Sequence, residues 1–409
     1  MLPIRARRNH KRLLWFVVAV LMILIATAFV VIFFNQSVHT PEQKTVTSKS
    51  EVVSKPVAIS SNMLFMGDVF WGRYINDWSQ ASSLKTSYPF SRLSEFNRMK
   101  YDAWIADLEC PSVNGVNMTS AQEDATLTFN CSPDYLPEAA KWFTIFGNAN
   151  NHSDNQGGMA GLIETRQHLE QNKIQYFGNF DPEVLKDVCE VTAMPVTISL
   201  DDKTTKKGSL PVAMCGYHGV FKIPSAASLA VMQAYAKVMP VIAFPHSGQE
   251  YKTGPDQIKT DLYRSMIDNG ADMVIGDHAH WIQNSESYKG HLIVYSMGNF
   301  IFDQQDTPEV VRSAAINVNM KLAANADTSQ LDAWLRIGSR CVAFQDDCMA
   351  QIASQGLKKL QVTYGFGVVG SNDSGKIVKP ATPDQQEAIL QRLNWQKTMT
   401  QLQAPYSSL

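Results

Sequence analysis

The chain has 409 residues, of which 45% are hydrophobic and 18% are charged, and its formal net charge is −2. These values are typical of a folded globular protein with one large domain or two ordinary ones. The near-neutral charge gives no basic surface, so we expect no nucleic-acid partner.

The N-terminal residues predict a membrane anchor. Residues 13–34 contain no charged side chain and are numerous enough for a helix that spans about 30 Å of hydrocarbon. Residues 1–12 carry basic but no acidic side chains, which predicts a cytoplasmic tail. A cleaved signal peptide is the alternative, but its apolar core is usually about 7–15 residues long, and no good cleavage site follows here. We therefore expect a single-pass protein of the cell (inner) membrane with an extracytoplasmic main domain.

The rest of the chain divides by its apolar pattern. Residues 35–61 are rich in Ser, Thr, Val, Lys and Gln, which predicts an extended linker. Over residues 62–320, short β-branched apolar runs alternate with amphipathic helical stretches such as GLIETRQHLEQN and DQIKTDLYRSMIDNG. This alternation predicts an α/β domain with buried strands. The pattern weakens afterwards, and we interpret residues 321–409 as a C-terminal extension packed on the core.

The expected export of the main domain permits disulfide bonds. Cys341 and Cys348 bracket a short loop that a bridge can close, and Cys110 and Cys131 flank a polar, turn-rich segment and form a second possible pair. The two remaining cysteines lie in or beside apolar strand-like runs, and we interpret them as small buried hydrophobic residues: Cys189 and Cys215.

Polar residues repeatedly follow the strand-like runs. In open α/β sheets, binding sites form where the carboxyl ends of strands meet the loops. Carboxylate, amide and imidazole groups suit divalent Zn, Mn, Fe or Mg better than a soft ion, and we expect one or two ions. The candidate metal ligands are Asp68, Glu109, Asn151, His246, His278 and His280.

The spacing of these residues indicates hydrolytic chemistry. In GADMVIGDHAHWIQ, two histidines lie two apart just after a strand, so both imidazoles can reach one cluster. A two-metal centre clamps attacking and leaving oxygens and generates hydroxide near neutral pH. His152 would then be placed to protonate a leaving group. Each feature alone is more often a turn or a solvated side chain, but their occurrence at one kind of position favours a site. We expect three other histidines not to be ligands: His168, His218 and His291.

Eight motifs occur in a specific order over residues 62–304. They are FMGDVFWGR, ADLECP, TFNCSPDY, ANNHSDNQGGMAGLIET, NKIQYFGN, PHSGQEY, GADMVIGDHAHWIQ and VYSMGNFIFDQ. Together they resemble the CapA/PgsA family of capsule synthesis proteins, which belong to poly-γ-glutamate biosynthesis. The resemblance implies an α/β fold, an αββα four-layer sandwich like that of calcineurin-type metallophosphoesterases, preceded by one transmembrane helix.

The resemblance also implies roles for individual residues. Asp68 corresponds to the first-strand aspartate, and Glu109 stands where phosphoesterases commonly use a bridging Asp. Asn151 corresponds to the amide ligand and His152 to the neighbouring catalytic histidine. Two further residues of family motifs are expected to line the pocket: Glu250 and Asn299.

The chain departs from the family pattern at several positions. Asp68 is followed by Val69 and Phe70, so the usual Asp-x-His is missing and one metal position lacks a histidine. Near His152, the acidic residue Asp154 stands one place earlier than the usual Asp. The other departures are Ser247 after His246, where Trp is usual, and Asp277, where His is common.

These observations predict a membrane-anchored component of poly-γ-glutamate synthesis and export with a possible metal-dependent hydrolase site. The alternative is a non-catalytic accessory subunit that organises the synthetase and export complex. An extracytoplasmic phosphoesterase is a third option. The expected partners are membrane subunits of the capsule synthetase and export machinery, the membrane itself and an anionic polymer.

Overall fold

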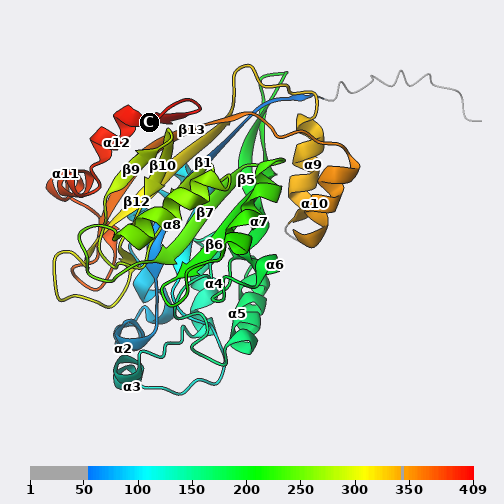
Figure 1. Ribbon diagram of the computed structural model, residues 1–409. Coiled ribbons are helices and arrows are strands. Elements are labelled where there is room, and N and C mark those ends of the chain that lie inside the picture. Colours follow the sequence, from blue (N-terminus) through cyan, green and yellow to red (C-terminus); the bar gives the residue numbers. More distant parts are fainter. Residues whose placement is uncertain (1–53, 342–344) are drawn as a thin grey trace, which may run out of the picture. The chain divides into compact units, whose positions relative to one another are not determined.

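The computed structural model describes residues 54–341 and 345–409 (Figure 1). The predicted tail, the predicted anchor and most of the predicted linker lie outside these ranges. Within them, no helix is long and apolar enough to cross a membrane. The first strand, β1 (Pro56–Val69), begins inside the segment predicted to be a linker.

The described part of the chain has a mixed α/β fold in which β1 is shared by two groups of strands. The first residues of β1 pair antiparallel with β5 (Cys189–Leu200), and its middle pairs antiparallel with β12 (Arg312–Leu322). Its last residues pair parallel with β2 (Ala103–Leu108) and β11 (Asn299–Ile301). One long strand therefore connects both groups and carries its C-terminal end to the centre of the molecule.

The first group runs from β14 through β13, β12 and β1 to β2, β3 and β4, and β15 pairs with β13. The second group continues from β5 through β6, β7, β8 and β10 to β9. Strands β1 to β4 are mutually parallel, and so are β6, β7 and β8. The strands not yet delimited are β3 (Ile145–Gly147), β4 (Gln175–Phe177), β6 (Thr205–Gly219), β7 (Val241–Ser247), β8 (Met273–Ile275), β9 (Ser285–Tyr288), β10 (His291–Val294), β13 (Val362–Asn372), β14 (Lys379–Pro380) and β15 (Tyr406–Ser408).

From Met63 to its end both faces of β1 are buried, and successive side chains enter different cores. Met63 and Phe65 belong to a core to which β5, β6 and β7 also contribute, and the Phe65 ring centroid lies 6.1 Å from that of Phe244 in β7. Leu64 and Met66 belong to a second core that is rich in aromatic rings. This alternation follows from the two-residue period of a strand. It explains why the strand sequences are continuously apolar, as is typical of strands that are covered on both sides.

Helices cover these strands, as Figure 1 shows. The expected amphipathic helices are present as α5 and α8. In the region predicted as a C-terminal extension, β13 pairs with β12 along its whole length and so extends the sheet. The helices are α2 (Arg73–Ala81), α3 (Ser120–Thr126), α4 (Leu136–Ala139), α5 (Met159–Gln171), α6 (Leu185–Val188), α7 (Ala226–Ala236), α8 (Gln257–Asp268), α9 (Leu331–Cys341), α10 (Gln345–Ser354), α11 (Pro383–Arg392) and α12 (Trp395–Gln401).

The six cysteines form three disulfide bonds: Cys110–Cys131, Cys189–Cys215 and Cys341–Cys348. The interpretation of Cys189 and Cys215 as unbonded hydrophobic residues is therefore wrong, although both are buried. The physical reason is register. The two residues stand directly opposite each other in the antiparallel pair β5–β6, with 4.0 Å between their Cα atoms. Strand pairing of this kind cannot be obtained from apolar character alone.

Candidate metal centre

The centre lies where parallel strands end. Asp68 is near the end of β1, Glu109 directly follows β2, and Asn151 lies in the turn after β3. His246 is near the end of β7, and the loop after β8 carries His278 and His280. Parallel neighbours end at the same edge of a sheet, so these side chains meet. All six are buried, and none exposes more than 9% of its surface.

His246 is at the middle of the cluster. Its Nδ1 lies 2.9 Å from Asp107 Oδ2 and 3.7 Å from Asp68 Oδ1. Its Nε2 lies 2.8 Å from Asn151 Oδ1 and 3.7 Å from Glu109 Oε1. One imidazole therefore faces two groups of oxygen atoms, one on each side of the ring.

The loop after β8 closes the cluster from the other side. His278 Nδ1 lies 3.0 Å from His246 Nε2, and His280 Nδ1 lies 3.3 Å from Asp68 Oδ2. Both histidines have positive φ, +88° and +54°. Such a backbone is uncommon for non-glycine residues and is concentrated at functional sites. The loop thus holds both rings toward the carboxylates at a conformational cost.

Three sets of three residues each place their ligand atoms within 4.8 Å of one another, and the sets share residues. Glu109 belongs to two of them, so its two oxygens can contact two ions. The sets are Glu109 with His246 and His278, Asp68 with Glu109 and His280, and Asp68 with Asp107 and His246.

The donor atoms fit a divalent ion. Both carboxylate oxygens of Asp68 and of Glu109 are buried without a well-formed hydrogen bond to any described residue, and so is Asp107 Oδ2. Buried charges without partners are strongly unfavourable, and natural proteins pair them or use them to coordinate metals. Together with neutral imidazoles, these oxygens form a donor set suited to Zn, Mn, Fe or Mg. Buried Asp, Glu and His residues here can therefore hold a metal ion.

The electrostatics of the cluster point in the same direction. Burial, followed by the nearby Asp107 charge, raises the pKa of Asp68 well above its usual value. Burial, followed by the Asp68 charge, does the same to the pKa of Glu109. Burial also lowers the pKa values of His246 and His278. Crowded carboxylates and unprotonated imidazoles are the state that a bound cation stabilises.

Two buried residues of the cluster, Asp107 and Lys259, escaped prediction, and a third, Asp277, was named only as a departure from the family pattern. Asp107 lies two residues before Glu109, so the strand period that places Glu109 at the cluster also places Asp107 there, and ADLE contained that signal. Asp277 is fully buried, and its Oδ1 accepts a hydrogen bond from Ser296 at 3.2 Å. Lys259 in α8 is also buried and donates to the Asp277 carbonyl oxygen at 3.1 Å. A lysine within an amphipathic helix gives no sequence signal of burial.

His152 lies beside the cluster in a particular environment. Its Nε2 is 3.8 Å from Glu109 Oε1, and its ring stacks on Phe129 with 4.0 Å between centroids. Burial lowers the pKa of His152 to about 4. Burial of the ring therefore favours the neutral imidazole. The expected role of His152 as proton donor to a leaving group stays a prediction.

The other residues considered from the sequence have defined positions. Asn299 is buried, and its Oδ1 lies 2.7 Å from His280 Nδ1. Glu250 is exposed, and its charge raises the pKa of His280 against the larger, lowering effect of burial. The three histidines that we expected not to be ligands each contact a backbone carbonyl through Nδ1: His168 with Ser112, His218 with Phe180 and His291 with Asp272.

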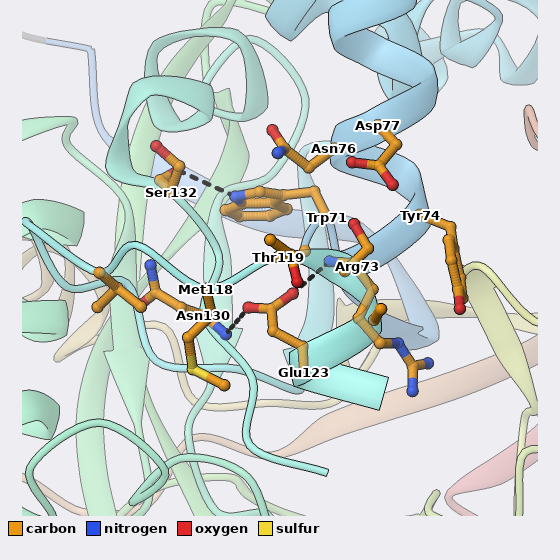
Figure 2. Close-up of a pocket in the computed structure, with 14 residues that line it drawn as sticks. Trp71, Arg73, Tyr74, Asn76, Asp77, Met118, Thr119, Glu123, Asn130 and Ser132 are labelled. Carbon is orange, nitrogen blue, oxygen red and sulfur yellow. Dashed lines mark hydrogen bonds between the residues drawn. The ribbon is translucent and has the colours of Figure 1, made fainter. Parts of the chain in front are cut away.

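A cavity of about 380 Å³ adjoins the centre between α2 and α3 (Figure 2). Trp71 Nε1 donates to the Ser132 carbonyl at 3.1 Å, and the Glu123 carboxylate accepts from the backbone N–H groups of Arg73 and Asn130. The Arg73 guanidinium lies 4.5 Å from the centroid of the Phe129 ring, which in turn stacks on His152. Arg73, which lines the cavity, thus contacts the aromatic ring that packs on His152.

Comparison with known proteins agrees with this arrangement. The family described as "Bacterial capsule synthesis protein PGA_cap" matches residues 62–304, which contain all six candidate ligands. The chain is 27% identical over 264 residues to the PGA biosynthesis protein CapA of Bacillus subtilis (strain 168), covering 64% of this chain and 67% of that protein. It is 24% identical over 255 residues to the capsule biosynthesis protein CapA of Bacillus anthracis, covering 59% and 60%. The chain therefore spans about two thirds of the length of these relatives.

A solved structure, that of TT1561 of Thermus thermophilus, aligns with 62% of this chain and 93% of its own. The TM-score is 0.33 and the sequence identity is 10%. A likeness at this level does not establish a common fold.

Proposed function

Because the chain belongs to the family of bacterial capsule synthesis proteins, we propose that it is a membrane-anchored component of poly-γ-glutamate or related capsule synthesis and export. In this proposal the main domain faces outward, has the four-layer αββα arrangement of metallophosphoesterases, and carries a metal-dependent hydrolase site. The names of the two Bacillus relatives support the biosynthetic context. The membrane anchor depends on residues 13–34, which lie outside the described ranges.

The observation that carries the hydrolase is a set of buried carboxylate oxygens of Asp68, Glu109 and Asp107, which make no well-formed hydrogen bond to a described residue and lie beside three imidazoles. Buried carboxylate oxygens that lack a hydrogen bond or an opposite charge lower the stability of a folded protein, and a bound cation would remove this cost. Convergence at several strand ends, on residues far apart in sequence, is also the usual location of an α/β active site.

The chemistry follows from these groups. A divalent ion held by Asp68, Glu109, His246, His278 and His280 would supply a hydroxide near neutral pH and stabilise negative charge on a reacting oxygen. Asn151 Oδ1 fixes the orientation of His246 through their 2.8 Å contact. The burial of the cluster excludes bulk water and strengthens its interactions with developing charge. Such a site serves hydrolysis of a phosphoester or of an amide bond in the polymer.

The test is metal content followed by hydrolysis. The full chain is purified and its metals are measured by elemental analysis, next to a His278→Ala, His280→Ala variant and a His168→Ala control. We expect at least one equivalent of divalent ion in the wild type and the control and its loss in the double variant. Hydrolysis of a phosphodiester and of a γ-glutamyl amide should follow metal content. Folded protein that takes up neither Mn nor Zn would overturn the proposal.

One observation favours the second candidate, an accessory subunit that organises the synthetase and export complex. The candidate ligands are almost completely buried, as is expected of a metal that stabilises structure. Polymer production by cells carrying His152→Ala distinguishes the candidates, because the ligand set remains complete. Normal production and export with this variant, combined with failure of His278→Ala, would favour the accessory role.

A further inference from the structure

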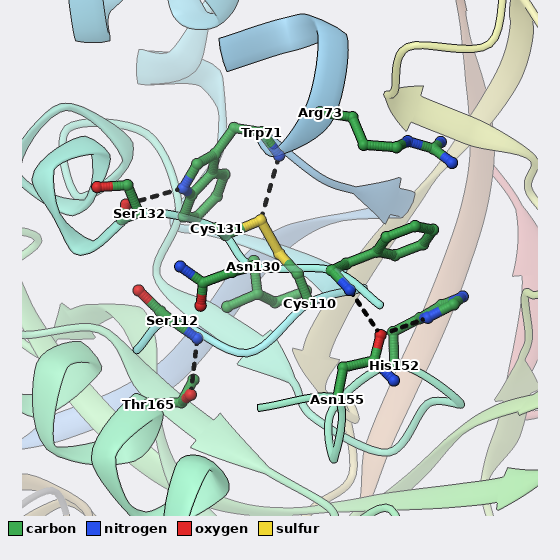
Figure 3. The surroundings of a disulfide bond; sticks show 12 residues. Trp71, Arg73, Cys110, Ser112, Asn130, Cys131, Ser132, His152, Asn155 and Thr165 are labelled. Atoms are coloured by element: carbon green, nitrogen blue, oxygen red, sulfur yellow. Dashed lines mark hydrogen bonds between the residues drawn. A yellow bond between two sulfur atoms is a disulfide. The ribbon is translucent and has the colours of Figure 1, made fainter. Parts of the chain in front are cut away.

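The partner of His152 is Asn155, in the same turn after β3. Asn155 Oδ1 lies 2.9 Å from His152 Nδ1 and accepts a hydrogen bond from the backbone N–H of Phe129, also at 2.9 Å (Figure 3). Asp154, the acidic residue beside it, is exposed. The amide side chain of Asn155 therefore occupies, three residues after His152, the position where the family pattern has a carboxylate.

These two contacts determine which ring nitrogen carries the proton. A backbone N–H can only donate, so the Asn155 atom that faces Phe129 is the amide oxygen. An amide oxygen can only accept, so His152 Nδ1 must carry a hydrogen atom. In the neutral ring the other nitrogen, Nε2, then has a free lone pair, and it is directed to the side of Glu109, 3.8 Å from Oε1.

The surroundings hold this arrangement in place. The Phe129 carbonyl accepts a hydrogen bond from Gln156 Nε2 at 3.1 Å, so both polar backbone groups of Phe129 are engaged. The Phe129 ring stacks on the His152 ring. The Cys110–Cys131 bond joins the residue after Glu109 to the segment that contains Phe129. The covalently closed loop therefore holds Phe129 near Glu109, and His152 packs on Phe129.

We propose that Asn155 is a positioning residue, which holds His152 as the Nδ1-protonated tautomer and so directs the unprotonated Nε2 toward the centre. The inference rests on the proposed hydrolytic function. As a water oxygen forms its bond to the substrate, its O–H bond breaks and the proton passes to Nε2. The Nδ1–H stays on Asn155, and the Glu109 carboxylate offsets the charge of the imidazolium. The proton then leaves from Nε2 to the departing group.

The tautomer can be measured directly in the metal-free full chain. Histidine is labelled with ¹⁵N in its ring, and long-range ¹H–¹⁵N spectra are recorded near pH 7.5. The chain has nine histidines, so the His152 signals are assigned by their absence from a His152→Gln variant. We expect a protonated Nδ1 and an unprotonated Nε2. A protonated Nε2 in the wild type would overturn the proposal, whether or not the protein hydrolyses any substrate.

Variants separate positioning from general stability. In Asn155→Leu the Nδ1 acceptor is lost, and we expect the Nε2-protonated form, with Glu109 as acceptor, to become the major one. Asn155→Asp retains an acceptor oxygen and should restore the wild-type tautomer. The matched control is Asn114→Leu, which removes the Asn114 contact to His168 Nε2 and should leave the His152 signals unchanged.

An unchanged His152 tautomer in a folded Asn155→Leu protein contradicts the proposal. If that variant does not fold, the wild-type spectrum decides. If the tautomer is as expected but hydrolysis is absent, the proposed function fails and the positioning role stands.

Discussion

Two neighbouring regions of this protein bury charge in different ways. At the start of α2, the Arg73 guanidinium makes a two-fold contact with Asp303, through Nε at 2.9 Å and Nη2 at 2.5 Å, and aromatic rings surround it. At the strand ends, four carboxyl groups gather around imidazoles whose pKa values are lowered by burial, and no arginine of the described residues forms an ion pair with them. Lys259, the one buried lysine near them, makes no ion pair with them at 4.0 Å or less within the described residues.

The difference separates a structural element from a binding site. The Arg73–Asp303 pair is complete as it stands, since each charged group has an opposite charge and defined hydrogen bonds. The strand-end centre instead keeps buried carboxylate oxygens without a well-formed hydrogen bond to any described residue, and its groups could hold a cation. Burial and charge alone therefore do not identify a functional site, whereas unsatisfied hydrogen-bonding capacity within a buried cluster does.

The largest expected effect comes from breaking the complete pair. Arg73→Met leaves the Asp303 carboxylate buried without its partner, and we expect the free energy of unfolding to fall by about 3–5 kcal/mol. The exposed pair Arg336–Asp332 provides the control, because Arg336→Met should cost at most about 1 kcal/mol. Denaturant unfolding of the full chain measures both. Equal, small losses would mean that the Arg73 pair contributes no more than a surface pair.

Removing a carboxyl group from the strand-end centre should not lower the stability of the metal-free protein. Glu109→Gln replaces a buried carboxyl group whose ionisation is disfavoured by burial, so the metal-free protein should be no less stable than the wild type. The variant should lose the stabilisation by Mn or Zn, which amounts to about 2.7 kcal/mol for the wild type at a metal concentration of about 100 times Kd. Thermal unfolding with and without metal tests this. A Glu109→Gln protein that is still stabilised by metal as strongly as the wild type contradicts the assignment.

The pH dependence of stability sharpens the comparison further. Burial raises the pKa of Asp107 from 3.8 to about 7. A raised pKa means that the folded state holds its proton longer than the unfolded state. Its stabilising contribution is therefore present below about pH 4 and is lost as the pH rises to about 7. The metal-free wild type should lose stability relative to Asp107→Asn across this interval, on the order of a few kcal/mol in total.

This experiment compares the wild type with Asp107→Asn at every pH. The contributions of neighbouring histidines to the pH dependence occur in both proteins and therefore largely cancel in the difference. The exposed residue Asp306 supplies the control: Asp306→Asn should differ from the wild type by a nearly constant amount across the interval. A difference between wild type and Asp107→Asn that does not change with pH would show that folding does not raise the pKa of Asp107.

The sequence was informative where a single strand carries both the position and the chemistry. His246, His278, His280 and Glu109 each follow or end an apolar strand, and strand ends of a parallel sheet must meet. The alternation of strands and helices likewise indicated the mixed α/β class. The clustering of these candidate ligands was therefore accessible from the local pattern.

Contacts that depend on strand register or on partners far away in the sequence could not be predicted from the sequence. Cys189 and Cys215 are bonded because β5 and β6 pair in one register out of several. Arg73 meets Asp303 across 230 positions of sequence, and the tautomer of His152 depends on the backbone N–H of Phe129. The pairing of the Arg73 and Asp303 charges and the position of the proton on His152 both depend on the tertiary structure. Local sequence motifs do not contain this information.

The smallest expected effect concerns Lys259. Its ammonium group lies against the Asp277 carbonyl, and burial lowers its pKa to about 7, so near neutral pH a fraction of positive charge lies beside the cluster. In Lys259→Met this charge is absent and the carboxylates attract a divalent ion more strongly. Titration calorimetry with Mn at pH 6 should show tighter binding by about 1 kcal/mol, roughly fivefold, whereas the exposed control Lys397→Met should bind as the wild type does. The gain should shrink toward pH 8, because Lys259 of the wild type is then mostly neutral. Weaker binding in Lys259→Met at both pH values would instead mean that Lys259 mainly holds the β8 loop in place for His278 and His280.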